Sequence, residues 1–377
     1  MRENEIKTVG VVTMHKVINY GSFLQAYATQ CVIEKLGYKC EIIDYDFPNE
    51  WHLDRGVCGS TGIRRKISNI IHKFGLKAGH RKKIKINRAV NRYLNLSKRY
   101  KNPYEIKNSP PIYDVYITGS DQTWNPKHTK GDDTFLLKFA PENAKKISFS
   151  ASIAGKNLNE EYHLSFKELL NQYDHISIRD SGGNAIMKDL IGKDVRVTLD
   201  PTLMLNRKEW SEFAKNSKLN LPKDGYIIFY LITHSFDVTP YIYKLLKELQ
   251  VNTGLKVYSF SKIPSSFGIS HETCSDISVE DFIELFEKSS YVVTSSFHGT
   301  AFAVNFGIPL YSVIDSLDTT DDRQVSLLRK LEIEQCLVPL NKPFKEIQPS
   351  YNVEKEQNNL DTLRTQSLQY LTDSLSY

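Results

Sequence analysis

Short apolar runs without polar alternation recur along the chain, and each is followed by a polar turn and a helical pattern. The first run is 8–13 (TVGVVT), and helical spacing follows it over 23–36 and ends at Gly37. The run 226–232 (YIIFYLI) restarts the alternation in the second half. Continuous runs of this length are typical of strands that are buried on both faces of a parallel sheet. The alternation therefore predicts an α/β fold of two consecutive strand–helix units.

The length of 377 residues favours two domains, because a domain usually spans about 100–200 residues. The segment 200–206 follows the sixth expected strand and contains a proline that would stiffen a connection between domains. We therefore expect an N-terminal domain over 1–205 and a C-terminal domain over 206–350. Leucines spaced along 351–377 predict a final amphipathic helix.

Basic charge is concentrated in one segment, 56–104, which we expect to be a helical insertion in the N-terminal domain. It holds 14 Lys and Arg and no Asp or Glu, and subtracting these from the net charge of +5 leaves −9 for the rest. Isoleucines fall on one helical face over 63–74, and a second basic helix is expected over 82–96. Two interpretations stay open: contact with an anionic membrane surface or lipid-linked phosphate, or a solvated insertion. The segment lacks a nucleic-acid motif, so we expect no nucleic-acid partner.

Several observations indicate a cytoplasmic protein, with contact to the inner face of the membrane as the open alternative. The chain has no run of about 18 or more apolar residues, so we expect no transmembrane helix. The charged N-terminus lacks the apolar core of a secretory signal. Five cysteines are scattered without Cys-x-x-Cys spacing, which is typical of a reducing compartment. The same scatter, and the absence of a His/carboxylate cluster, predicts no metal site.

The stretch 291–300 (YVVTSSFHGT) reads as a strand, a tight turn and the start of a helix, with His298 near that start. In an open parallel sheet, ligands bind outside the carboxyl ends of strands. The backbone N–H groups of a helix start also favour an anion there. The alternative is a polar turn in which Ser or Thr caps the helix without binding anything.

A second polar turn follows the strand expected over 113–118, and it contains a tryptophan among polar residues. An aromatic face beside Asp, Gln and Asn side chains suits a sugar ring, which needs apolar contact with its C–H face and hydrogen bonds to its hydroxyls. We therefore interpret this turn as a sugar-binding loop formed by Ser120, Asp121, Gln122, Trp124 and Asn125.

Three further turns are candidate ligand loops. The loop 19–22 lies between the first strand and its helix, and Arg179 ends the strand expected over 175–179. Arg179 suits a carboxylate or phosphate, or it forms a salt bridge with Asp180 or another acid. The third turn follows 226–232 and contains His234.

With these motifs in hand, the chain resembles the polysaccharide pyruvyl transferase family. The resemblance rests on four blocks in order, which together span roughly residues 8–340: NYGSFLQAYA with EKLGY and IIDYD; DVYITGSDQTWNP; ISIRDSGG with LDPTLML; and YVVTSSFHGTAFAVNFGIPL. It implies a GT-B-like fold, in which two Rossmann-type domains face each other across a cleft and a C-terminal helix packs back on the first domain. The N-terminal domain would take the acceptor and the C-terminal domain the donor.

The resemblance also implies a reaction. The family moves the enolpyruvyl group of phosphoenolpyruvate onto a sugar, often galactose or N-acetylmannosamine, of a glycan or lipid-linked precursor. The product is a cyclic pyruvate ketal of a capsular, extracellular or cell-wall polysaccharide. No cofactor besides the donor is implied. His298 and Asp121 are the expected catalytic residues, as acid or base and as the group that orients or deprotonates the acceptor hydroxyl.

The remaining expected site residues follow from the same motifs. Ser296 stands where the family tends to have Arg, so we expect Arg323, His234, or hydroxyls and backbone N–H groups to replace that charge. The expected donor-binding residues are Arg179, Ser295, Ser296, His298, Gly299, Thr300 and Arg323. The expected acceptor-binding residues are Asn19, Tyr20, Gly21, Ser22, Ser120, Asp121, Gln122, Trp124 and Asn125.

Two other functions stay open from the sequence. The first is a GT-B glycosyltransferase, which would use a nucleotide sugar and also needs a cationic site for a diphosphate. The second is a glycan-binding relative without donor chemistry, which the serine at 296 would fit.

Overall fold

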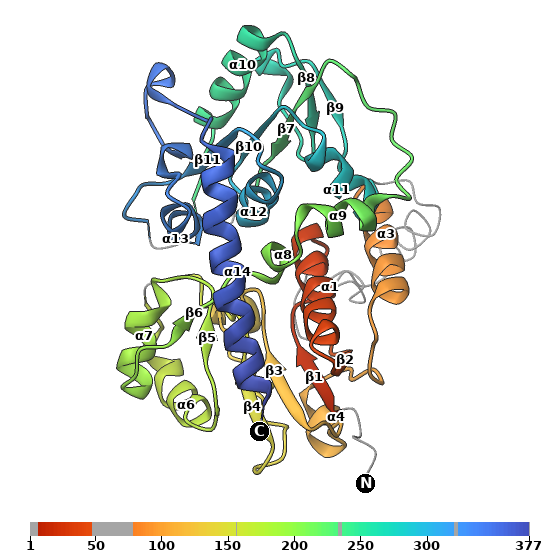
Figure 1. Ribbon diagram of the computed structural model, residues 1–377, viewed down its shortest axis with the longest axis vertical. Helices are drawn as coiled ribbons and strands as arrows, with labels where there is room; N and C mark the ends of the chain where they lie inside the picture. The colour runs from red at the N-terminus through yellow and green to blue at the C-terminus, as the bar shows by residue number, and fades with distance from the viewer. Residues whose placement is uncertain (1–6, 47–77, 156, 233–235, 320–322, 377) are drawn as a thin grey trace, which may run out of the picture. The chain divides into compact units, whose positions relative to one another are not determined.

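The structure is a computed structural model that describes residues 7–46, 78–155, 157–232, 236–319 and 323–376. The chain divides into two compact units (Figure 1). Unit 1 comprises Met1–Gly75, Ile86–Met204 and Leu363–Tyr377, and unit 2 comprises Leu76–Lys85 and Leu205–Thr362. The sequence placed the boundary at 205/206 and the whole insertion 56–104 in the N-terminal domain, whereas residues 76–85 of that insertion group with unit 2. Each unit is described by itself below.

Unit 1 is built on parallel strands in the order β2-β1-β3-β4, with β5 and β6 forming a further parallel pair. Isolated parallel bridges link residues of the β4 and β5 regions. The strands are β1 (Thr8–Val12), β2 (Lys39–Ile42), β3 (Val115–Thr118), β4 (Lys145–Ser148), β5 (Ser177–Ile178) and β6 (Arg196–Val197). The helices that lie wholly in this unit are α1 (Tyr20–Lys35), α4 (Pro103–Asn108), α5 (Pro126–Thr129), α6 (Glu160–Leu170), α7 (Gly183–Ile191) and α8 (Pro201–Met204).

Unit 2 contains a six-stranded sheet in the order β12-β11-β10-β7-β8-β9, in which every pair is parallel. The strands are β7 (Tyr226–Tyr230), β8 (Lys256–Ser259), β9 (His271–Thr273), β10 (Tyr291–Thr294), β11 (Leu310–Ile314) and β12 (Leu337–Pro339). The helices are α9 (Arg207–Ala214), α10 (Tyr241–Thr253), α11 (Val279–Glu287), α12 (Phe297–Phe306) and α13 (Arg323–Lys330). Strands β9 and β12 are not predicted from the sequence, because three residues give too short a pattern.

Two helices contribute residues to both units. These are α3 (Ala78–Tyr93) and α14 (Val353–Leu375), and Figure 1 shows α14 as one long helix in dark blue. The C-terminal part of α14 is tied to unit 1, because the Tyr370 hydroxyl donates to the carbonyl of Ser148 at 2.9 Å. The backbone N–H of Leu199 also donates to Ser367 Oγ at 2.9 Å. The last turns of the chain therefore complete unit 1.

Buried apolar strands explain why both sheets form. In unit 2, all five residues of β7 are buried, and β10 and β11 are buried almost throughout. Helix α12 packs on β10 and β11, and all ten of its residues are buried. Such continuous burial requires helices on both faces of a parallel sheet. The expected α/β fold with parallel sheets is therefore confirmed.

Two features predicted from the sequence cannot be compared with the structure. The basic helix expected over 63–74 and the residue His234 lie outside the described residues. The second basic helix is observed as α3. Among the helices of the described ranges, none is long and apolar enough to cross a membrane.

Candidate active site

In unit 1, Asp121 lies at the centre of a buried polar network at the carboxyl end of β3. Its backbone has a left-handed φ of 73°, which an L residue other than Gly rarely adopts. Its Oδ2 accepts from Ser22 Oγ at 2.8 Å, and its Oδ1 accepts from the backbone N–H of Gln122 at 2.9 Å. The carbonyl of Asp121 also accepts from the N–H of Ser152 at 2.9 Å. These bonds hold the carboxylate in one orientation despite the strained backbone.

Gly119 makes the approach of this loop to the next strand possible. Its φ is +120°, and a Cβ at this position would lie 2.2 Å from the carbonyl oxygen of Phe149. No larger residue fits without moving backbone, so the glycine fixes the start of the loop. The sequence places Asp121 two residues after this glycine, at the end of the sheet where ligands bind in α/β folds.

Arg179 and Asp200 join Asp121 in what we call the ion-pair cluster. Arg179 Nη1 lies 2.6 Å from Asp200 Oδ2, and Nη2 lies 3.5 Å from Asp121 Oδ1. All three side chains are buried, with that of Asp200 0% exposed. Ser120 Oγ donates to the same Asp200 oxygen at 3.1 Å. One cation therefore faces two carboxylates, so the cluster is a poor receptor for an anion.

This geometry answers the alternatives left open for Arg179. A salt bridge is present, and its partners are Asp200 and Asp121. The role of Arg179 in donor binding stays a prediction, and the two carboxylates weigh against it. Asp200 was missed as a site residue. It follows β6 as Arg179 follows β5, and the ends of neighbouring parallel strands meet, which is the signal that could have found it.

The expected stacking of a sugar on Trp124 is wrong for this structure. The side chain is 0% exposed, and its Nε1 donates to the carbonyl of Phe135 at 3.0 Å. Its ring packs edge-on against Tyr173, with centroids 5.8 Å apart. Burial of a large apolar ring in the core stabilises the fold more than exposure in a polar turn, so the Trp124 ring lies in the core.

The other expected acceptor residues mostly serve the local fold. Asn19 caps α1 by accepting from the N–H of Gly21 at 2.8 Å, and Asn125 caps α5 by accepting from Lys127 N at 3.1 Å. Tyr20 is 0% exposed. Gln122 is half-buried, and its Oε1 accepts from Asn125 Nδ2 at 2.7 Å. Of this group, the structure brings Ser22 and Ser120 into the network around Asp121 and Asp200.

A second charged group that sequence analysis missed lies after β1 and β2. Lys16 pairs with Asp44 and with Asp46, whose Oδ1 is 2.8 Å from its Nζ, and Arg99 Nη2 lies 2.6 Å from Asp46 Oδ2. Burial disfavours the charged form of Asp44, but hydrogen bonds from His15 and Lys16 outweigh it and lower its pKa to about 2. The IIDYD block carried this signal, as two acids directly after a buried strand.

In unit 2, the turn between β10 and α12 is held by what we call the hydroxyl cluster: Thr294, Ser295, Ser296, Thr300 and Ser312. Thr294 Oγ1 donates to the carbonyl of Tyr230 at 2.7 Å, and Ser295 Oγ donates to that of Ile232 at 2.7 Å. Ser296 is the N-cap of α12 and accepts from Gly299 N at 3.3 Å. The capping alternative is thus observed for Ser296.

Packing explains the glycine of this turn. A Cβ on Gly299 would lie 2.4 Å from Thr294 Oγ1 and 3.1 Å from Tyr230 Cδ1. The glycine therefore lets the first turn of α12 lie against the end of the sheet. Thr300 Oγ1 and Ser312 Oγ are 2.9 Å apart, which ties the same turn to β11. Gly299 and Thr300 thus have structural roles here, and their contact with a ligand stays a prediction.

His298 lies in the first turn of α12, and Arg323 lies near the ring of its neighbour Phe297. His298 is the second residue of the helix, is 6% exposed, and its ring meets that of Phe297 edge-on at 5.4 Å. The guanidinium of Arg323, at the start of α13, lies 6.0 Å from the centroid of the Phe297 ring. An imidazole, a guanidinium and the positive end of a ten-residue helix dipole are therefore neighbours.

Within the described residues, no group of three or more His, Cys, Asp or Glu side chains is placed to hold a metal ion. The arrangement can instead supply polar and cationic groups from side chains and helix ends. Unit 2 offers an imidazole and a cation at a helix start, and unit 1 offers an oriented carboxylate.

Comparison with solved structures defines the class first. The chain is similar to the putative UDP-N-acetylglucosamine 2-epimerase of Listeria monocytogenes at 10% identity and a TM-score of 0.53, over 98% of this chain and 91% of that one. The chain is 8% identical to the Rickettsia bellii UDP-N-acetylglucosamine 2-epimerase, with a TM-score of 0.53 over 98% of this chain and 96% of that one. The chain is 10% identical to the Neisseria meningitidis UDP-GlcNAc 2-epimerase bound to UDP-GlcNAc, with a TM-score of 0.51 over 98% of this chain and 99% of that one. These likenesses show the GT-B fold that the sequence predicted.

The family follows from a second comparison. The model of the polysaccharide pyruvyl transferase family matches residues 19–316, which is most of the chain, and the chain belongs to that family. The resemblance drawn from the four sequence blocks is thus confirmed. No curated protein matches the chain.

Proposed function

We propose that this chain transfers the enolpyruvyl group of phosphoenolpyruvate onto a sugar of a glycan or lipid-linked oligosaccharide, as a cyclic ketal, in the synthesis of a capsular, extracellular or cell-wall polysaccharide. The observation that carries the proposal is the start of α12, where His298 and Arg323 flank Phe297 within a chain of this family. An anionic donor needs cationic or N–H-rich groups, and a helix start beside a guanidinium supplies them.

The chemistry assigns a proton transfer to each half of the reaction. A proton is added to the methylene carbon of phosphoenolpyruvate, so its C2 gains oxocarbenium character. One sugar hydroxyl attacks C2 and phosphate leaves, and a second hydroxyl closes the ring. The two hydroxyls lose two protons, of which one balances the proton gained by the methylene carbon and the other leaves with phosphate.

His298 is the group we assign to proton transfer at the donor, because an imidazole can both give and accept a proton near neutral pH. Asp121 is the group we assign to the acceptor hydroxyl. Its oxygens already accept from Ser22 and Gln122 N–H, so its carboxylate is pre-oriented. Asp200 is a positioning residue in this scheme, since it holds Arg179 beside Asp121.

The proposed function extends to where the enzyme meets its acceptor. Cytoplasmic residence with contact to an anionic membrane through the basic segment 56–104 would bring the enzyme to a lipid-linked acceptor. Helix α3 presents Arg81, Arg88 and Arg92 as exposed residues, and Ile84 is 42% exposed. Burial lowers the pKa of Lys82 to about 8, so this lysine carries about half its charge at that pH and less above it.

The deciding experiment is incubation of the full chain with phosphoenolpyruvate and candidate lipid-linked glycans, followed by mass spectrometry of the glycans. The expected result is a gain of one pyruvyl group with loss of water, together with release of phosphate in equal amount. Acceptors ending in galactose and in N-acetylmannosamine form separate arms, so the sugar is identified in the same experiment.

A thermal-shift titration distinguishes the competing functions. Stabilisation by phosphoenolpyruvate, and not by UDP or UDP-sugars, is expected, because a ligand raises the melting temperature of the state that binds it. The reverse pattern would indicate a nucleotide-sugar glycosyltransferase. Stabilisation by glycans alone would indicate a glycan-binding relative without donor chemistry.

A further inference from the structure

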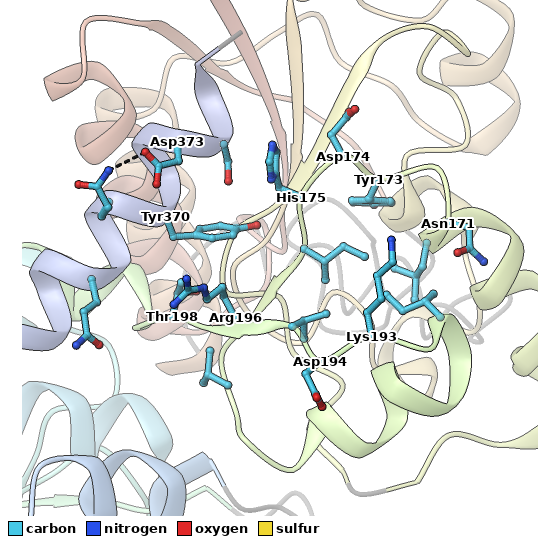
Figure 2. Close-up of a pocket in the computed structure, with 18 of the residues that line it drawn as sticks. Asn171, Tyr173, Asp174, His175, Lys193, Asp194, Arg196, Thr198, Tyr370 and Asp373 are labelled. Atoms are coloured by element: carbon cyan, nitrogen blue, oxygen red, sulfur yellow. Dashed lines mark hydrogen bonds between the residues drawn. The ribbon is translucent and has the colours of Figure 1, made fainter.

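A pocket of about 700 Å³ lies within unit 1, and its lining includes no residue of the ion-pair cluster. Its lining comes from the segment before β5, from the residues around β6, and from the last turns of α14 (Figure 2). Arg179 and Asp200 come after β5 and β6, whereas most lining residues of these two segments come before or within the strands. The pocket is therefore at the opposite edge of this parallel pair from the ion-pair cluster.

The lining offers hydrogen-bond donors and acceptors from opposite sides. Lys193, Asp194 and Arg196 come from the β6 side, and Gln366 comes from α14. All four are exposed. Among the described residues, neither Lys193 nor Arg196 has an ion-pair partner, and Asp194 has only the distant Nζ of Lys188 at 3.7 Å. These groups are available to a ligand.

An aromatic ring completes the lining. Figure 2 shows Tyr370 reaching from α14 toward the middle of the lining residues. Its hydroxyl is anchored on the Ser148 carbonyl at 2.9 Å, and burial raises its pKa, so the phenol stays neutral. The half-buried ring thus has a fixed position from which its face can pack on the C–H groups of a ligand.

Charge and size narrow the class of ligand. The lining has three carboxylates, of Asp174, Asp194 and Asp373, against two basic side chains, which disfavours a simple anion. So many polar groups also disfavour an apolar ligand. A volume of about 700 Å³ lies inside the range of roughly 300–1,000 Å³ that small-ligand sites occupy. A neutral, hydroxyl-rich molecule with an apolar ring face meets all of these conditions.

We propose that this pocket is a carbohydrate-binding site for a neutral sugar of one or two rings, separate from the residues assigned to pyruvyl transfer. Carboxylates of the lining accept from sugar hydroxyls, Lys193 and Arg196 donate to ring and hydroxyl oxygens, and the Tyr370 ring packs on the sugar face. Its use as an accessory site that holds the acceptor glycan rests on the proposed function. The binding chemistry itself does not.

The test is saturation-transfer-difference NMR on the full chain with lactose and cellobiose as probes, and glucose 1-phosphate as the anionic arm. The pocket variant is Lys193→Ala/Asp194→Ala/Gln366→Ala, which changes exposed side chains only. The matched control is Lys167→Ala/Glu168→Ala on α6, which is exposed and does not line the pocket. Circular dichroism melting of each variant checks that the fold is kept, and Gln366→Ala alone serves if the triple variant melts early.

We expect transfer to at least one disaccharide in the wild type and the control, and a fall of roughly tenfold in affinity in the pocket variant, since each lost hydrogen bond weakens binding. No transfer to either disaccharide overturns the proposal. So does equal transfer in the pocket variant and control, or binding of glucose 1-phosphate alone. Because no phosphoenolpyruvate is present, these outcomes leave pyruvyl transfer untouched. Pocket-dependent sugar binding here, combined with no pyruvylated product in the separate mass-spectrometry experiment with phosphoenolpyruvate, would overturn the proposed function and leave the binding site standing.

Discussion

The two units place polar clusters at the carboxyl ends of parallel strands, but they build them from different chemistry. Unit 1 uses charges: Arg179 between Asp121 and Asp200, and Lys16 between Asp44 and Asp46. Unit 2 uses hydroxyls, which bond to backbone carbonyls and to one another. The hydroxyl cluster carries no formal charge, and the guanidinium of Arg323 lies 6.0 Å from the centroid of the ring of Phe297, which follows the cluster's Ser296.

The difference teaches how the two halves would divide the work. Charged groups that are paired and buried hold one carboxylate in a fixed orientation, at the cost of desolvation. A neutral turn at a helix start leaves the helix dipole to act on a ligand. Under the proposed function, the first arrangement would orient the acceptor and the second would bind the anionic donor.

The largest expected effect is on catalysis through unit 2. His298→Asn should lower kcat by about 10²–10⁴-fold, because removal of a general acid or base costs that much. Phosphate release with the true acceptor measures it. Ser312→Ala is a matched control in the same unit, since it removes a buried hydroxyl that carries no proton in the proposed reaction. If His298→Asn kept wild-type turnover, His298 would have no role in proton transfer. The assignment of the donor to unit 2 would then lose its main support.

The next effect is on stability through unit 1. Arg179→Met should destabilise unit 1 by about 3–5 kcal/mol, because it leaves two carboxylates buried without their cation. Hydrogen exchange with mass spectrometry in increasing urea reports unit 1 peptides separately from unit 2 peptides. Lys188→Met is the control, since its pair with Asp194 is exposed and worth about 0–1 kcal/mol. Equal protection in the two variants would show that the ion-pair cluster does not stabilise unit 1.

Acid should lower the stability of unit 1 through Asp44. The pKa of Asp44 falls from 3.8 to about 2 on folding, so the folded state binds its proton less readily than the unfolded state. This stability is present above pH of about 4 and is lost as the pH falls toward 2, and a shift of about two units corresponds to about 2 kcal/mol.

Urea unfolding across this pH window checks the expectation, with Asp44→Asn as the test variant. The variant should be less stable than the wild type at pH 7 and should lose less stability between pH 4 and pH 2. Asp189→Asn is the control, because its side chain is 70% exposed. An unchanged acid dependence in Asp44→Asn would mean that other carboxylates set the acid limit of unit 1.

The smallest effect concerns the hydroxyl cluster itself. Ser296→Ala removes the N-cap of α12 and should cost about 1 kcal/mol of stability. Ser296→Asp keeps a capping oxygen and adds a negative charge at a helix start, so it should retain stability. The same charge should raise the KM for phosphoenolpyruvate by repulsion, which steady-state kinetics measures. If the aspartate variant kept the wild-type KM, the donor would not bind beside Ser296.

Much of the fold was predictable from local pattern. Buried runs such as 226–232 and 291–294 carry the strand signal in their own residues, and a helix such as α12 carries its start in Ser296 and its end in Gly307. These interactions act between residues that are close in sequence, so they can be read without the fold. The sequence blocks likewise sufficed for the family, which the family model supports over 19–316.

Only the tertiary structure decided which side chains meet. Trp124 could have faced a ligand or the core, and the space beside Tyr173 decided for the core. Asp200 became part of the candidate site because β5 and β6 end side by side. The pocket is lined by residues near 170–198 and 365–374, which are far apart in sequence. Pairing and packing across such separations depend on how the sheet and the last helix are assembled, and no local pattern contains that information.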